Sequence, residues 1–181
     1  MNTSCRTLTA LFSFVVATLC AAPALAAGNL DSEAKAALQS LYQKTPAARA
    51  LGDKAQGILV FPSVVKAGLI VGAQGGDGVL YRKGKPAGYY NTSAVSIGYQ
   101  AGAQKFGYAL FLMSESAMQY LANANGWELG VGPSIVVVDA GMAKNLSTTT
   151  AHSDIYAFIF DQKGLMAGAG IQGAKISKIG Q

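Results

Sequence analysis

Apolar runs of strand length follow one another through the middle of this chain, and turns of only a few residues join them. Residues 58–61 form one such run, which a proline closes. Two more, residues 68–74 and 79–82, flank the glycine-rich segment 75–78, whose composition favours a hairpin turn. A second turn is predicted at residues 83–86. Parallel strands need a crossover of about a dozen residues, so these short connections indicate antiparallel pairing rather than βαβ units.

Helical segments precede and interrupt the strands. Residues 31–44 place apolar side chains at the spacing of one helix face, with polar residues opposite. Thr45 followed by Pro46 predicts the N-cap and first residue of a short second helix that ends near Gly52. Ser114 is predicted to cap a mid-chain helix. Further strands are predicted at residues 88–100, 104–113, 134–138, 154–161 and 165–171.

Together these elements predict an α+β domain. Its mainly antiparallel sheet is expected to curl into a barrel or sandwich, with N-terminal helices and one mid-chain helix. The composition agrees, because 51% apolar and only 13% charged residues exclude a disordered chain. We place a single domain at residues 27–181, after a signal peptide at residues 1–26.

The N-terminal segment has the pattern of a secretory signal. Arg6 gives it a positive start, and residues 8–20 form an uncharged run that is too short to span a membrane. Residues 24–26 then supply a small-x-small cleavage pattern. We therefore expect an exported protein that begins at Ala27 and is periplasmic or membrane-associated in a Gram-negative-type envelope.

Residues that could carry catalysis or bind a metal are scarce in this chain. Cys5 and Cys20 both lie in the segment expected to be removed. Lipid attachment at Cys20 is an alternative, although Leu19 is larger than the residue that bacterial lipidation sites prefer there. His152 is the only histidine, and no serine lies in a nucleophile elbow. We therefore expect no enzyme, no cofactor and no metal site.

Small and polar residues alternate with apolar ones between Ser96 and Gln104. In a strand, this alternation places Gln100 and Gln104 on the same face. Two interpretations are open: the glutamines line a ligand cavity, or the glycines between them allow close packing against another element.

Three basic residues, Arg82, Lys83 and Lys85, cluster at the second predicted turn, in a chain whose net charge is +5. The cluster is either a solvated group that protects a sheet edge or a patch that binds anionic lipid. Nucleic acid is not an expected partner, because the chain has an export signal and no nucleic-acid-binding motif.

Four blocks of the sequence, in order, resemble the SYLF domain family. They are residues 57–68 (GILVFPSVVKAG), residues 78–80, residues 90–104 around GYQAGAQ, and residues 147–168. The resemblance implies a lipid-binding module, because eukaryotic members bind phosphoinositides through basic residues and some also bind actin. Lys66 and Lys163 are the basic residues in the matching blocks and would join the turn cluster. Actin is not expected as a partner, since an exported protein of a bacterial type does not meet it.

The predicted function is therefore non-enzymatic binding of anionic, phosphoinositide-like phospholipid headgroups at a membrane surface in the cell envelope. The alternative is a small outer-membrane β-barrel or an envelope structural protein, which glycine-rich strands after a signal peptide favour. Residues 135–138 are consecutively apolar and break the alternation that strands of such a barrel require.

Overall fold

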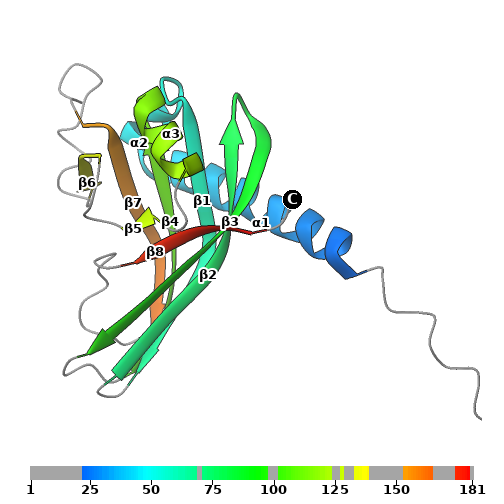
Figure 1. The fold of residues 1–181 in the computed structure, drawn as a ribbon, viewed down its shortest axis with the longest axis vertical. Coiled ribbons are helices and arrows are strands. Elements are labelled where there is room, and N and C mark those ends of the chain that lie inside the picture. The colour runs from blue at the N-terminus through cyan, green and yellow to red at the C-terminus, as the bar shows by residue number, and fades with distance from the viewer. Residues whose placement is uncertain are drawn as a thin grey trace, which may run out of the picture.

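Among the residues that the computed structural model describes, eight strands form one sheet in the order β5-β8-β3-β2-β1-β4-β7-β6 (Figure 1). The structure describes residues 22–68, 71–97, 102–123, 127–128, 133–138, 153–164 and 174–179. The helices are α1 (Ala22–Lys44), α2 (Pro46–Gly52) and α3 (Glu115–Asn123). The strands are β1 (Gly57–Gly68), β2 (Val71–Arg82), β3 (Lys85–Ile97), β4 (Gly102–Leu112), β5 (Trp127–Glu128), β6 (Ile135–Val138), β7 (Ile155–Gly164) and β8 (Lys175–Ile179).

The pairing is antiparallel throughout the described sheet, with one exception. β6 runs parallel to β7, along which Ile135 lies opposite Ile155. The α+β class and the mainly antiparallel pairing predicted from the short turns are therefore confirmed.

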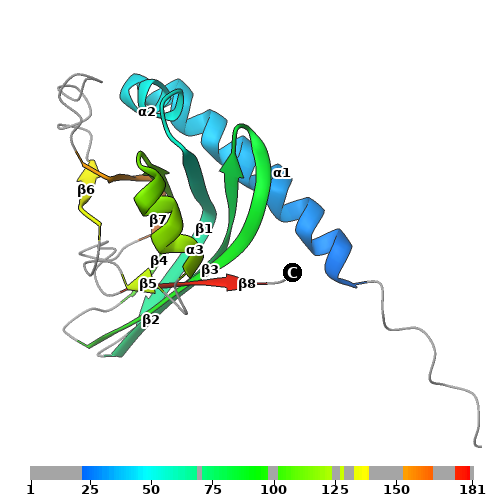
Figure 2. The same cartoon turned by 45° about the horizontal axis from the view of Figure 1, so that its top comes forward.

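The sheet is open, so the predicted closure into a barrel or sandwich is wrong. β5 and β6 lie at the two ends of the strand order, and no pairing joins them within the described part of the chain. They contain two and four residues, which is too few for the long edge ladders that closure needs. Helices cover the sheet instead, with α1 and α2 on one face and α3 on the other (Figure 2).

Within the apolar run at residues 58–61, Leu59, Val60 and Phe61 are buried on alternate faces of the sheet, as the lack of polar alternation indicates. Leu59 and Phe61 belong to the core cluster that includes Met118 of α3. Val60 belongs to the cluster on the other face, with Leu41 of α1. This half of the sheet is therefore the middle layer between two helical layers.

The first predicted turn is wrong, because the glycine-rich segment 75–78 lies inside the continuous strand β2. β1 also continues past its proline to Gly68, through a bulge at which its pairing with β4 shifts between Phe61 and Val64. A Cβ on Gly78 would lie 2.6 Å from Phe61 Cδ1, and one on Gly76 would lie 2.5 Å from a backbone oxygen of the bulge. These glycines allow the two strands to approach closely and do not form a turn.

The second predicted turn is confirmed. Lys83 and Gly84 connect β2 to β3 with φ angles of 51° and 74°. Two successive residues with positive φ are typical of a type I′ hairpin turn. Arg82 and Lys85 pair across the base of this turn.

The predicted helices are confirmed with changed limits. α1 begins at Ala22, before the predicted start, and α2 begins at Pro46 as predicted, although Thr45 makes no side-chain capping bond. The Ala117 N–H donates a hydrogen bond of 3.2 Å to Ser114 Oγ, which caps α3. In the part of the chain that the structure describes, no helix combines the length and apolarity needed to cross a membrane.

Two differences concern the C-terminal part of the chain. β8 was not predicted, although Ala174 and Ile176 are buried there. The predicted strand at residues 165–171 lies outside the described residues, as does His152.

Candidate functional site

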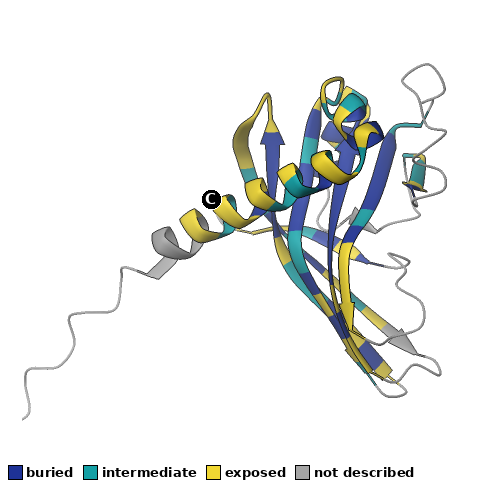
Figure 3. Ribbon diagram, turned by 180° about the vertical axis from the view of Figure 1, so that it is seen from behind, coloured by how far each residue is buried: buried dark blue, intermediate teal, exposed yellow. Residues whose placement is uncertain are grey.

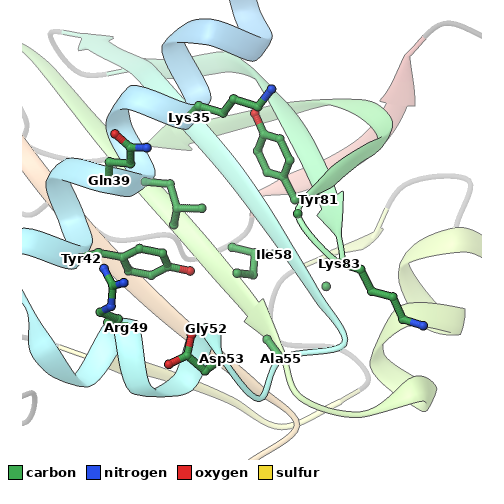
Figure 4. Close-up of a pocket in the computed structure, with 13 residues that line it drawn as sticks. Lys35, Gln39, Tyr42, Arg49, Gly52, Asp53, Ala55, Ile58, Tyr81 and Lys83 are labelled. Carbon is green, nitrogen blue, oxygen red and sulfur yellow. The ribbon is translucent and has the colours of Figure 1, made fainter.

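A groove lies between the two N-terminal helices and the hairpin turn of β2 and β3 (Figure 4). Its volume is about 520 Å³. Leu38, Tyr42 and Ile58 give it apolar walls, while Arg49 and Lys83 supply positive charge from α2 and from the turn. We call this cavity the helix–hairpin groove.

The local sequence shapes one end of this groove. α2 ends at Gly52, where a Cβ would lie 2.2 Å from the Tyr42 hydroxyl oxygen. The centroid of the Tyr42 ring also lies 6.3 Å from the centroid of the Phe111 ring, which belongs to strand β4 of the sheet. The Arg49 guanidinium carbon is 5.8 Å from the Tyr42 ring centroid, a distance at which a cation is attracted to the aromatic face. Arg49 is thereby oriented by the tyrosine.

The Tyr42 hydroxyl is held in its neutral form. Burial, assisted by the negative charge of Asp53 and opposed by Arg49, raises the pKa of Tyr42 to about 12. At neutral pH the phenol is therefore a hydrogen-bonding group without charge.

The opposite end of the groove is anchored by Asp31. Lys35 Nζ lies 2.7 Å from an Asp31 carboxylate oxygen, and the Tyr81 hydroxyl donates a bond of 2.8 Å to the other oxygen. The bond from Lys35 lowers the pKa of Asp31, partly offset by burial and assisted by Tyr81. Burial and the bond to Asp31 raise the pKa of Tyr81. This network joins α1 to β2 and leaves Lys35 partly neutralised.

The three residues of the turn cluster differ in their surroundings. Arg82 Nη2 lies 3.0 Å from both carboxylate oxygens of Glu115, so its charge is paired with α3. Lys83 and Lys85 are exposed. Lys83 also lines the helix–hairpin groove, whereas Arg82 and Lys85 do not.

The fold separates the other two predicted basic residues from the turn cluster. Lys66 lies nine positions along β1 from Gly57, which lines the groove; at about 3.3 Å per residue the separation is roughly 30 Å. Lys66 is buried, with Gln74 and Gln104 as its cross-strand partners. Lys163 is exposed on β7, opposite Lys105. The structure therefore brings Lys66 and Lys163 to one end of the sheet and the turn cluster to the other.

The predicted glutamine stripe falls partly outside the described residues. Gln100 lies outside them, whereas Gln104 is buried on β4. The Gln104 side-chain oxygen and the Gln74 side-chain nitrogen have no hydrogen-bond partner among the described residues. Thr92 and Tyr108 are also buried polar residues on this face, and burial raises the pKa of Tyr108.

Sequence reasoning missed the contributions of the two N-terminal helices. Tyr42 and Arg49 fall within the two predicted N-terminal helices, but nothing in a linear pattern shows which helix face opposes the hairpin turn. The Thr45-Pro46 break was the one available signal, since it reverses the chain and brings Arg49 back over Tyr42.

Comparison with known proteins gives consistent matches. Residues 93–180 match the family Ysc84, described as "Las17-binding protein actin regulator". The human protein named "SH3 domain-containing YSC84-like protein 1" is 28% identical over 163 residues, which cover 81% of this chain and 47% of that protein. The Xenopus laevis protein of the same name is 29% identical over 165 residues, covering 81% and 48%. The chain thus spans about half the length of the curated relatives it matches.

Proposed function

We propose that this chain, a distant relative of the Ysc84/SYLF domain proteins, binds anionic phospholipid headgroups at a membrane surface and catalyses no reaction. Domains of that family are linked to lipid and actin binding, and they are generally binding domains without catalytic activity. The finer statements that follow concern this chain's own residues.

One observation carries the proposal: the helix–hairpin groove brings Arg49 and Lys83 to the same cavity from two separate elements. A guanidinium recognises phosphate by paired hydrogen bonds, and an ammonium adds a mobile point charge. The groove volume of about 520 Å³ lies in the range of small-ligand sites. A phosphodiester headgroup fits this combination, with its glycerol portion against Leu38 and Ile58.

The place of action is part of the same proposal. The signal-like N-terminus supports export, so the lipids available would be the anionic phospholipids of a bacterial envelope. Actin regulation, which the family description names, is not extended to this chain, because an exported domain would not meet actin.

Titration with a soluble lipid tests the headgroup site without a bilayer. We expect dihexanoyl phosphatidylglycerol, below its micellar concentration, to bind, and dihexanoyl phosphatidylcholine to bind much more weakly. The double variant Arg49→Gln/Lys83→Gln should weaken phosphatidylglycerol binding at least tenfold, because each lost contact to a charged group is worth about 1.5–3 kcal/mol. Lys54→Gln, an exposed change outside the groove, is the matched control. Equal affinity of the double variant and the control would refute the proposal.

A further inference from the structure

An exposed apolar surface occupies the end of the sheet farthest from the helix–hairpin groove. Val65, Val71 and Val95 are 50%, 59% and 75% exposed. Cross-strand register places Ala67 opposite both Ala73 and Ala103, and Ala73 opposite Val95. Directly opposite residues point to the same face, so these side chains form one continuous patch. We call it the distal patch: Val65, Ala67, Val71, Ala73, Val95 and Ala103.

The distal patch is the uncovered part of the face on which α1 packs. Along β4 this face is buried at Phe111 and Ala109, beneath the helical layer, and exposed at Lys105 and Ala103. Between them lies Gly107, where a Cβ would lie 2.5 Å from the Phe160 ring, so that this ring closes the covered part. Figure 3 shows α1 crossing one half of this face and the long strands continuing beyond it.

A row of lysines crosses the sheet at the inner border of the distal patch. Following the register from β8 to β7, the row reads Lys175, Ser93, Gly75, Val65, Lys105, Lys163. All three lysines are exposed. From this row to the end of the sheet, the described residues include no carboxylate. These residues are 65–68, 71–75, 93–97, 102–105 and 162–164. The groove end is different, since Asp31, Asp53 and Glu115 accompany its cations there.

We propose that the distal patch docks this chain on an anionic bilayer, with the strand ends entering the interface and the lysine row at the level of the headgroups. This inference rests on the proposed function for the class of partner, and it assigns a second surface at the opposite end of the sheet from the groove. The groove and the distal patch therefore contact a flat bilayer in turn rather than together. Two residues of strand beyond the row reach about 7 Å, and four reach about 13 Å. Apolar faces of interfacial elements enter to about 5–10 Å, so the patch has the required depth.

Charge favours a bilayer over a second copy of the chain as the occupant. Face-to-face packing of two distal patches would bring the exposed rows of Lys105, Lys163 and Lys175 toward like charges. An anionic lipid surface instead attracts each of them. Valine and alanine patches rimmed by basic residues also suit shallow, reversible insertion.

Co-sedimentation with vesicles tests the docking surface. The full chain is mixed with 3:1 phosphatidylcholine/phosphatidylglycerol vesicles at low and high salt. We expect Lys105→Gln/Lys163→Gln/Lys175→Gln to lower vesicle affinity about 100-fold, because each lysine near an anionic surface contributes roughly a fivefold factor. The control Lys54→Gln/Lys85→Gln/Lys178→Gln removes the same charge from exposed sites elsewhere. Equal losses in both triple variants would overturn the proposal, because net charge alone would then explain binding.

A fluorescence measurement tests insertion separately. In a Trp127→Phe background, which removes the native tryptophan, Val95→Trp should shift to shorter wavelength on these vesicles and be quenched by brominated lipid, whereas Val137→Trp, at an exposed valine of β6, should not. An unquenched Val95→Trp, or a dimer that Val95→Ser dissociates, would overturn the docking proposal. Binding of soluble dihexanoyl phosphatidylglycerol should be unchanged in every distal variant. Failure of the groove and failure of the distal patch are thus distinguishable.

Discussion

Lys105 on β4 lies directly opposite Lys163 on β7, and both side chains are exposed. Like charges in directly opposite positions destabilise a sheet. The pair therefore opposes folding in solution, and an anionic surface would relieve the repulsion. This arrangement links the stability of the sheet end to the proposed docking on lipid.

Lys163→Glu should make the domain more stable and bind vesicles more weakly. The substitution turns a repulsive cross-strand pair into an attractive one, a change of about 0.2–1 kcal/mol in the free energy of unfolding. Urea denaturation measures the gain, and co-sedimentation with anionic vesicles measures the loss. A variant that is more stable and binds vesicles as tightly as the parent would separate Lys163 from lipid binding.

Gly78→Ala should destabilise the fold. Its Cβ would lie 2.6 Å from Phe61 Cδ1 and 2.7 Å from the Val60 carbonyl oxygen, and such overpacking costs about 1–3 kcal/mol. Gly75→Ala on the same strand is the control, because its nearest neighbour is the Thr92 carbonyl oxygen at 3.7 Å. Thermal unfolding compares the two. If both variants melt at the same temperature, close packing does not explain the glycines of β2.

The stability of the domain should fall at high pH as Tyr42 ionises. Its folded pKa is raised to about 12 from an ordinary value of 10.0. The folded state therefore favours the neutral phenol, and this contribution is fully present below pH 10 and is lost as pH rises through about 12. The difference in absorbance between the parent and Tyr42→Phe, followed from pH 9 to 13, reports the ionisation. A transition for this residue near pH 10 would contradict the burial of its hydroxyl.

The exported protein should begin at Ala27. The cleavage pattern at residues 24–26 motivates this expectation. Intact-mass measurement of protein recovered from the envelope of an expressing bacterium identifies the terminus. A species that starts at Cys20 and carries acyl chains would instead show a lipid-anchored protein.

Local chemistry made several elements predictable from the sequence. Pro46 at the start of α2, Ser114 at the cap of α3 and Lys83-Gly84 at the turn all act through neighbours within a few residues. Strand pairing was predictable in direction because the connections are short. The apolar run at residues 58–61 indicated a strand, and Leu59, Val60 and Phe61 of that strand are buried.

The binding surfaces were less predictable, because each depends on residues far apart in the chain. The sequence showed five candidate basic residues but not that Lys66 would be buried and lie about 30 Å from the turn cluster, at about 3.3 Å per residue. It showed Arg49 without indicating that the residue would line the same groove as Lys83.

The amino-acid sequence by itself determined the starts of α2 and α3, the hairpin turn at Lys83-Gly84 and the antiparallel direction of the main strands, since capping, positive φ and loop length are local properties. Tertiary structure alone decided that Gly76 and Gly78 pack against β1 at its bulge, that the sheet stays open, and that Lys175, Lys105 and Lys163 form one row. The register of strand pairing is the physical reason why the sequence alone does not show which side chains share a face. A bulge between Phe61 and Val64 shifts the pairing of everything beyond it, and a shift of one residue moves each side chain to the other face.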